Sequence, residues 1–460
     1  MGRSIMALRE LTTDLTPETR EELRESLRAS VSKPAAIRLT SLDAYRGFIM
    51  LVMASAGFNF ALVYHRLSAA SWPWEPDREP SAVWKFLAYQ FDHVSWIGCS
   101  FWDLIQPSFM FMVGVAIPFS YASRQAKGES HGTICKHAVI RSLILILLAV
   151  FLSTPGHQQT NFVFVNVLAQ IGLGYMVVFF LRGRGLAIQF LAMAIILVGY
   201  WLLFILHPMP GSDFNFQKEA GLPANWPHLT GRAAHWDKNT NFAAWVDQSF
   251  LNLFPREEQF QFNEGGYQTL NFIPSIATMI FGLMAGELLR GSKSQTAKLG
   301  WLLSAGVLCL LTGLLVDHLI WPDWLANFMA ELGTRLDLTN TPFFGRTWTL
   351  CPIVKRIWTP SWAVFSAGWT FLMLALFYLV IDMLGFRGWA FPLVVVGMNS
   401  IAIYCMSQLL KPWIRQSLQL HFGQRIFDGV YGPLVSATAV LFILWLICFW
   451  MYRQKIFVRI

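Results

Sequence analysis

Apolar runs of about 20 residues recur along this chain, and they constrain its fold more than any other feature. A helix needs roughly 20 apolar residues to cross a bilayer, and only helices or closed barrels satisfy their backbone polar groups there. Only 13% of the 460 residues are charged, whereas soluble domains carry about a quarter. The sequence therefore predicts an all-α, polytopic integral membrane protein.

About ten membrane spans are expected from the apolar runs. They lie near 46–66, 97–121, 137–154, 162–181, 185–206, 268–290, 299–320, 361–383, 389–410 and 432–452. The short connections after the second, fourth, sixth and eighth spans are basic, as is the tail. These cations are Arg124, Lys127, Lys136, Arg141, Arg182, Arg184, Arg290, Lys293, Lys298, Arg387, Arg453, Lys455 and Arg459. Because short cytoplasmic connections carry an excess of Lys and Arg, both termini are predicted to be cytoplasmic.

This topology divides the chain into a polar N-terminal segment, 1–37, and a membrane domain, 38–460. Thr16-Pro17-Glu18 predicts a helix start within the first segment. Four longer connections are predicted outside the membrane, at 67–96, 207–267, 321–360 and 411–431. The connection 207–267 holds aromatic, amide and charged side chains, Trp236 among them, which suit a carbohydrate ligand. They suit a folded cap with ordinary interfacial aromatics equally well.

Net charge and cysteine usage exclude several classes of partner. The formal charge of +8 is explained by positive-inside topology, and no nucleic-acid-binding motif accompanies it. The six cysteines are scattered without a C-x-x-C pair, so we expect neither a metal site nor a disulfide framework.

Asp43 and Arg46 stand immediately before the first predicted span. They are three residues apart, so on a helix they share a face and can form an ion pair. One interpretation is a structural anchor at the membrane interface. The other is a cytoplasmic mouth at which Arg46 binds the phosphates of a ligand.

His93 and Asp103 flank the start of the second predicted span. Polar groups at the mouth of a membrane helix are costly, which indicates a functional role. Histidine can accept a proton near neutral pH, and a carboxylate can hold the imidazole in the required tautomer. The ten-residue spacing does not show whether Asp103 reaches His93. Ser100 to Asp103 also has the pattern of a capping box, which would give the aspartate a local role.

Polar side chains also occur within predicted spans, at Asn166 and Gln170 in the fourth and at Asn399 and Ser400 in the ninth. In lipid, such groups often link neighbouring helices. The alternative is that they line a passage for a polar ligand.

Several motifs occur in one order along the chain: S-L-D-x-x-R-G from Ser41, H-x-S-W-x-G…D-L-x-x-P from His93, G-M-N-S-I from Gly397 and Y-R-x-K-I-F from Tyr452. Residues 281–286 add F-G-L-M-A-G. Together these motifs resemble the membrane-bound acetyltransferase family of heparan-α-glucosaminide N-acetyltransferase. The resemblance covers roughly Arg38 to Ile460.

The resemblance implies that acetyl-CoA enters from the cytoplasm and that its acetyl group passes to an amino sugar on the opposite side. It implies that His93 is catalytic and that Asp103 and Asn399 belong to the site. The family asparagine near the end of the first span has no clean counterpart, because Asn59 is displaced by about two residues. The family Gln-Arg of the fourth span is replaced by Ala169-Gln170.

The sequence thus predicts a multi-pass acyltransferase, placed in a bacterial inner membrane, that uses acetyl-CoA and a sugar or glycan acceptor. The predicted catalytic residues are His93 and Asp103, with direct transfer and an acetyl-histidine intermediate both open. The predicted CoA-binding residues are Asp43, Arg46, Arg124, Asn399 and Ser400. The predicted acceptor-binding residues are Asn59, Trp96, Gln170 and Trp236. No metal is expected, and a homodimer is compatible with the sequence. The alternative function is a small-solute transporter or exporter.

Overall fold

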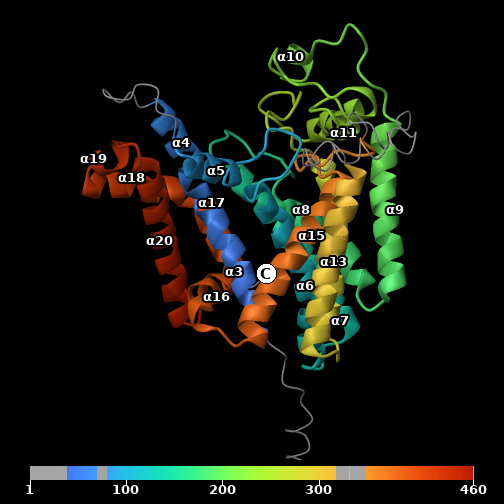
Figure 1. Cartoon of the computed structure of the whole chain (residues 1–460), viewed down its shortest axis with the longest axis vertical. Helices are drawn as coiled ribbons and strands as arrows, with labels where there is room; N and C mark the ends of the chain where they lie inside the picture. Colours follow the sequence, from blue (N-terminus) through green and yellow to red (C-terminus); the bar gives the residue numbers. More distant parts are fainter. Residues whose placement is uncertain (1–38, 70–79, 318–330, 332–348, 459–460) are drawn as a thin grey trace, which may run out of the picture.

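The computed structural model describes residues 39–69, 80–317, 331 and 349–458. In this part of the chain the secondary structure is helical without strands, apart from one isolated bridge between Ile97 and Val354. Figure 1 shows a bundle of long helices with a layer at one end that carries α10 (Phe216–Glu219) and α11 (Phe242–Phe250). The predicted segment 1–37, Arg459 and most of the predicted connection 321–360 lie outside the described residues.

Helices occur at all ten predicted spans. In chain order they are α3 (Thr40–Ala54) with α4 (Phe60–Ala69), α6 (Ile105–Gln125), α7 (His131–Ser153), α8 (Val167–Leu181), α9 (Leu186–Ile205), α12 (Phe272–Arg290), α13 (Gln295–Val316), α15 (Pro360–Phe377), α16 (Phe391–Gly397) with α17 (Ser400–Leu409), and α20 (Gly432–Arg453). Among the described residues, eight spans are long and apolar enough to cross a membrane, and the bent pair of α16 and α17 gives a ninth if counted as one. The all-α polytopic prediction is confirmed, whereas ten full spans are not found.

The fourth predicted span is shorter than expected because Asn166 caps its helix. The Asn166 side chain accepts a hydrogen bond from Ala169 N at 3.0 Å, so α8 begins at Val167 and has 15 residues. The same amide donates to Ala149 O and Ser153 Oγ, each at 3.1 Å. Asn166 therefore ties the start of α8 to the end of α7, as amides within membranes often do.

The most buried helices are α6, α12 and α15. In α12, 78% of the apolar window is buried inside the protein, whereas in α9 and α13 the share is only 22%. Figure 1 shows α9 and α20 at opposite sides of the bundle. These outer helices present large apolar side chains such as Leu191, Ile195 and Phe442 to the surroundings, as expected for contact with lipid.

Glycines allow α6 and α12 to pack closely. A Cβ atom at Gly282 would overlap Phe111 O, and one at Gly114 would overlap Met279 O. Small residues at such contacts let helix backbones approach, which is a main source of helix association in lipid. The F-G-L-M-A-G stretch of the sequence is thus explained by packing of α12 against α6.

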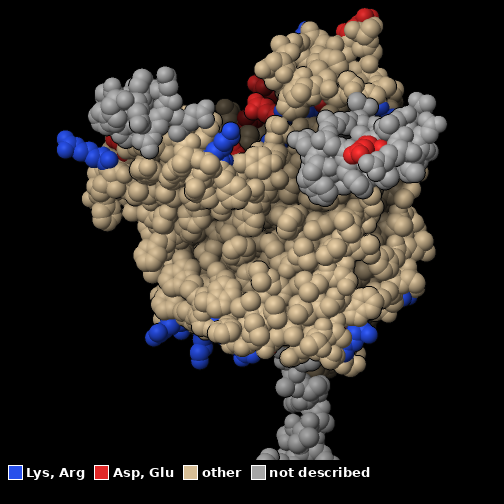
Figure 2. All heavy atoms as spheres, viewed as in Figure 1, with Lys and Arg blue, Asp and Glu red and all other residues tan. Residues whose placement is uncertain are grey.

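The two ends of the bundle differ in structure and charge. The end with α10 and α11 also carries α5 (Ala82–Gln90), α18 (Lys411–Phe422) and α19 (Arg425–Asp428), which belong to predicted external connections (Figure 1). Figure 2 shows Lys and Arg along the opposite rim, while the Asp and Glu visible in this view lie towards the α10–α11 end. We refer to these as the capped end and the basic end.

Candidate active site

His93 and Asp103 form a hydrogen-bonded pair in the connection between α5 and α6. His93 Nδ1 lies 2.7 Å from Asp103 Oδ1. The Asp103 side chain is 1% exposed, whereas the His93 side chain is 33% exposed. The carboxylate is therefore buried behind an imidazole that remains accessible. In the described part of the chain, His93 Nε2 has no hydrogen-bond partner and is free to act on a substrate.

The second oxygen of Asp103 organises the backbone around the pair. Ser100 N donates to Asp103 Oδ2 at 3.2 Å, and Asp103 N donates to Ser100 Oγ at 3.3 Å. This reciprocal arrangement is a capping box at the start of η2 (Trp102–Leu104). Val94 N also donates to Asp103 Oδ2, at 3.3 Å. Both interpretations of Asp103 therefore apply at once, because each role uses a different oxygen.

Lys355, which sequence reasoning did not identify, completes this cluster. Its Nζ lies 3.3 Å from Asp103 Oδ1 and 3.0 Å from His93 Nδ1, and its side chain is only 5% exposed. The ring of Tyr267 lies beside the cluster, 5.8 Å from Lys355 Nζ and 6.5 Å from the His93 ring centre. No spacing signal could have linked Lys355 to His93, since 262 residues separate them.

The surroundings favour a neutral His93. Burial lowers the pKa of His93, the hydrogen bond with Asp103 opposes this shift, and the positive charges of Lys355 and Arg356 lower the pKa further. A neutral imidazole that donates through Nδ1 to a carboxylate has a basic lone pair on Nε2. The site can therefore accept a proton from a substrate near neutral pH.

The two predicted tryptophans lie behind the cluster. Trp96 is 4% exposed, and its Nε1 donates to Trp236 O at 3.1 Å. Trp236 is fully buried, with its ring stacked on Phe204 at a centroid separation of 4.5 Å. Neither face of the Trp236 ring is exposed in this structure, so its predicted contact with an acceptor sugar stays a prediction. Both residues build the apolar core of the cap.

The other predicted acceptor residues have protein partners. Gln170 is fully buried, where its Oε1 accepts from Gln106 Nε2 at 3.1 Å and its Nε2 donates to Val165 O at 3.0 Å. Asn59 lies at the break between α3 and α4 with a φ of 54°, and its amide donates to Pro433 O at 3.1 Å. These residues link helices in this structure.

Asp43 and Arg46 form the predicted ion pair on α3. Their charged atoms are 3.9 Å apart, and the Arg46 side chain is 25% exposed. Arg141 of α7 is near enough to interact electrostatically with Arg46, and among the described residues its buried Nε has no hydrogen-bond partner. Arg141 also stacks over the Tyr175 ring at 5.0 Å. Guanidinium groups from two different helices, α3 and α7, thus interact electrostatically.

The remaining predicted CoA ligands are engaged elsewhere. Arg124, in the last turn of α6, pairs with Glu129 of the following connection at 3.0 Å. Asn399 stands at the 68° bend between α16 and α17, where its amide donates to Ile456 O and its carbonyl accepts from Val458 N, both at 3.1 Å. Ser400 Oγ donates to Gly397 O at 3.3 Å. The Asn399 amide therefore holds the C-terminal tail, and its expected contact with CoA stays a prediction.

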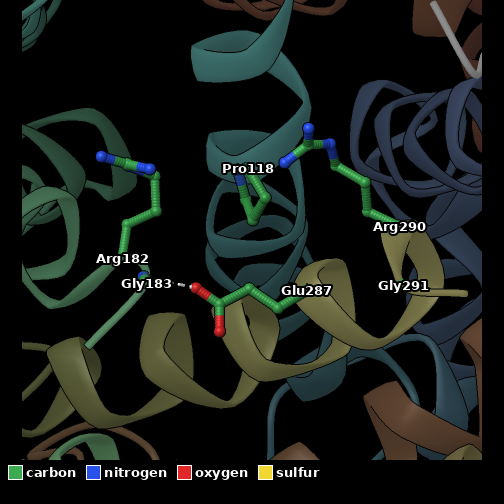
Figure 3. Close-up of a pocket in the computed structure, with 6 residues that line it drawn as sticks. All are labelled: Pro118, Arg182, Gly183, Glu287, Arg290 and Gly291. Carbon is green, nitrogen blue, oxygen red and sulfur yellow. Dashed lines mark hydrogen bonds between the residues drawn. The ribbon is translucent and has the colours of Figure 1, made fainter. Parts of the chain in front are cut away.

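A cavity of about 350 Å³ lies at the basic end of the bundle (Figure 3). It is lined by Pro118, Arg182, Gly183, Glu287, Arg290 and Gly291. Glu287 turns towards Gly183, whose N–H donates to the carboxylate at 2.7 Å (Figure 3). Arg182 and Arg290 stand at the C-terminal ends of α8 and α12, where cations complement the helix dipole. None of the predicted site residues lines this cavity.

Comparison with known proteins finds two similar curated proteins, each 24% identical to this chain. No protein-family model matches it. The heparan-alpha-glucosaminide N-acetyltransferase of Homo sapiens is 24% identical over 457 residues, which cover 92% of this chain and 60% of the human protein. The Mus musculus protein of the same name is 24% identical over 484 residues, covering 98% of this chain and 63% of the relative. The chain thus spans about three fifths of the length of these curated relatives. It is a distant relative of the heparan-alpha-glucosaminide N-acetyltransferases.

Proposed function

We propose that this protein is a transmembrane acetyltransferase. It takes an acetyl group from acetyl-CoA at the basic end of the bundle and transfers it to an amino sugar or glycan at the capped end. The observation that carries this proposal is the His93–Asp103 pair, which presents a free imidazole nitrogen at the capped end. The distant relatives support it, because they are named for N-acetyl transfer. We further propose a bacterial inner membrane as its location, with the basic end in the cytoplasm.

His93 acts as the general base in the proposed reaction. The acceptor amine attacks the thioester carbonyl carbon, forming a C–N bond, while His93 Nε2 takes the proton that the nitrogen loses. The C–S bond then breaks, and the CoA sulfur leaves as a thiolate that receives this proton from His93. Asp103 accepts the Nδ1 hydrogen bond throughout and stabilises the imidazolium. Such proton transfer contributes about 10²–10⁴-fold to a rate.

Arg46 and Arg141 are the proposed phosphate ligands of the donor. Their guanidinium groups interact electrostatically, and a phosphate between them would relieve that repulsion. The helix that carries Arg46 continues to Ala54, a rise of about 12 Å, and then breaks at residues 56–59. Gly57 within this break lies against Phe91 O, two residues before His93. Helix α3 therefore connects the proposed phosphate site to the neighbourhood of the base.

Reconstituted protein tests the proposal directly. Vesicles that contain the purified protein are supplied with radiolabelled acetyl-CoA on one side and glucosamine, or an oligosaccharide ending in glucosamine, on the other. Wild-type protein should form acetylated sugar and free CoA in equal amounts. His93→Asn should abolish both products while retaining CoA binding, because asparagine has no basic nitrogen. Arg46→Ala should raise the KM for acetyl-CoA more than the KM for the sugar.

A second histidine–aspartate pair supplies a matched control. His228 Nδ1 lies 2.8 Å from Asp237 Oδ2 in the cap, and the His228 side chain is 37% exposed. The two pairs are alike in chemistry and exposure, so His228→Asn should leave transfer unchanged if His93 has a specific role. Equal transfer by His93→Asn and wild-type protein would refute the mechanism. Uptake of sugar without acetylation would favour the transporter.

A further inference from the structure

Lys355 is a buried cation that the proposed reaction leaves without a role. Its Nζ lies within 3.3 Å of both members of the His93–Asp103 pair, and 5% of its side chain is exposed. Burial of a lysine is costly unless the ammonium is paired. Here the partner is Asp103 Oδ1, at 3.3 Å. The same carboxylate oxygen is therefore hydrogen-bonded to His93 Nδ1 and ion-paired with Lys355.

The backbone around Lys355 is fixed to the loop that carries His93. Ile97 and Val354 form an antiparallel bridge, and Gly98 N donates to Ile353 O at 3.0 Å. On the other side, Thr359 Oγ1 accepts from Val354 N at 3.0 Å. Two segments far apart in sequence are thus held in register by their backbones. These backbone contacts fix the position of Lys355, so its ammonium lies beside the His93 imidazole.

The distances define the tautomer of His93. Nδ1 lies 2.7 Å from a carboxylate oxygen and 3.0 Å from an ammonium nitrogen. It cannot donate to the first and accept from the second at the same time. A bare nitrogen lone pair at 2.7 Å from Asp103 Oδ1 would be repelled, so the proton resides on Nδ1. With the proton on Nδ1, the favourable interaction of Lys355 is its ion pair with Asp103.

We propose that Lys355 is a positioning residue for His93. Lys355 holds Asp103 where its carboxylate accepts the hydrogen bond from His93 Nδ1, and the positive charge of Lys355 electrostatically disfavours the imidazolium. This inference rests on the proposed function in one respect, namely that Nε2 is the base. The placement of Lys355 itself does not depend on that function. A cation beside the ring keeps Nε2 unprotonated at neutral pH, while Asp103 stabilises the imidazolium formed transiently during transfer.

Other charged and titratable groups surround the His93–Asp103 pair. Asp92 accepts from His93 N, the Tyr267 ring lies 6.5 Å from the His93 ring, and Arg356 interacts electrostatically with His93. Cys99 and Tyr89 interact electrostatically with Asp103. The Arg356 guanidinium is held by Gly265 O at 2.6 Å and by Val94 O at 3.3 Å. Lys355 is thus distinguished by its direct bond to the carboxylate that orients His93.

Site-resolved titration of His93 tests this role without requiring transferase activity. Diethyl pyrocarbonate modifies neutral imidazole, and mass spectrometry of the peptide containing His93 gives the extent of modification between about pH 5 and pH 8. Lys355→Met removes the charge but keeps an unbranched side chain of similar length. It should raise the midpoint of His93 modification by about one pH unit or more, because an adjacent cation is lost. Lys355→Arg should keep the wild-type midpoint.

Lys238→Met is the matched control. Lys238 is also a buried lysine of the capped end, 9% exposed, and lies over the Trp226 ring at 5.1 Å. Its replacement should leave the His93 midpoint unchanged. An unshifted midpoint in folded Lys355→Met protein would overturn the proposal. If Lys355→Met shifts the His93 midpoint but the wild-type protein transfers no acetyl group, the role of Lys355 is upheld and the proposed function is rejected. If Lys355→Met does not fold, a shifted midpoint in Lys355→Arg would overturn the charge argument.

Discussion

Asp103 combines two roles because its carboxylate has two oxygens. Oδ2 accepts from the backbone N–H groups of Ser100 and Val94, while Oδ1 faces His93 and Lys355. Charge-assisted hydrogen bonds of this kind are about twice as strong as neutral ones. A single residue therefore fixes both the fold of the loop and the orientation of the proposed base.

Asp103→Asn separates these two roles. Asparagine has one oxygen, so it can cap the loop or accept from His93, but it cannot do both. If its amide group faces Nδ1, the imidazole must place its proton on Nε2 and loses its basic site. We expect kcat per folded molecule to fall about 10²-fold or more, less completely than in His93→Asn, and thermal unfolding to occur at lower temperature. Preserved turnover with lowered stability would restrict Asp103 to the capping role.

The acid limb of the pH–rate profile should report the pKa of His93. Transfer requires neutral imidazole, so kcat/KM should fall as the pH drops through the His93 pKa. Burial and the nearby cations lower this pKa, so the midpoint should lie below the ordinary value of 6.5. Initial rates at saturating acetyl-CoA and low sugar concentration measure it. A midpoint above 6.5 would show that another group, or an imidazolium, controls the reaction.

At the scale of helices, close packing and bends place the polar residues. Glycines let α6 approach α12, and the start of α6 carries Asp103 through η2. Asn399 stands at the bend between α16 and α17, where its side chain binds the C-terminal tail. The F-G-L-M-A-G and G-M-N-S-I motifs therefore make structural contacts in this fold, besides any role in the proposed active site.

Gly282→Ala tests the packing of α6 on α12. The added Cβ would overlap Phe111 O, a backbone atom that cannot move aside alone. We expect the variant to lose about 1–3 kcal/mol of stability, as over-packed cores do. Gly199→Ala in α9 is the control, because nothing lies within 4 Å of its Cβ position. Thermal unfolding of both proteins in detergent gives the comparison, and equal melting temperatures would remove the packing argument.

At the scale of the whole molecule, proposed donor and acceptor sites lie at opposite ends. Figure 2 shows Lys and Arg along the rim of the basic end. His93 follows α5, which lies at the capped end (Figure 1). The proposed reaction therefore requires acetyl-CoA to enter from the basic end and to extend along α3 towards His93. This arrangement suits transfer between compartments better than reaction within one of them.

Cysteine labelling tests the orientation. Asp213 lies exposed in the cap, and Lys293 lies exposed in the connection between α12 and α13. In a background without the six native cysteines, Asp213→Cys should react with an impermeant thiol reagent in intact cells. Lys293→Cys should react only after permeabilisation, because the basic end is proposed to be cytoplasmic. The reverse pattern would invert the topology and exclude the proposed direction of transfer.

The sequence by itself determined the helical membrane fold, because backbone polar groups in lipid must be satisfied within a helix. Local spacing also identified the capping box at Asp103 and the ion pair between Asp43 and Arg46. Only the tertiary structure decided that Lys355 meets His93, that Trp236 is enclosed and that Asn399 binds the tail. These contacts depend on helix rotation and on the course of long connections. Periodicity along one helix records which face is apolar, but not which distant side chain will lie against it.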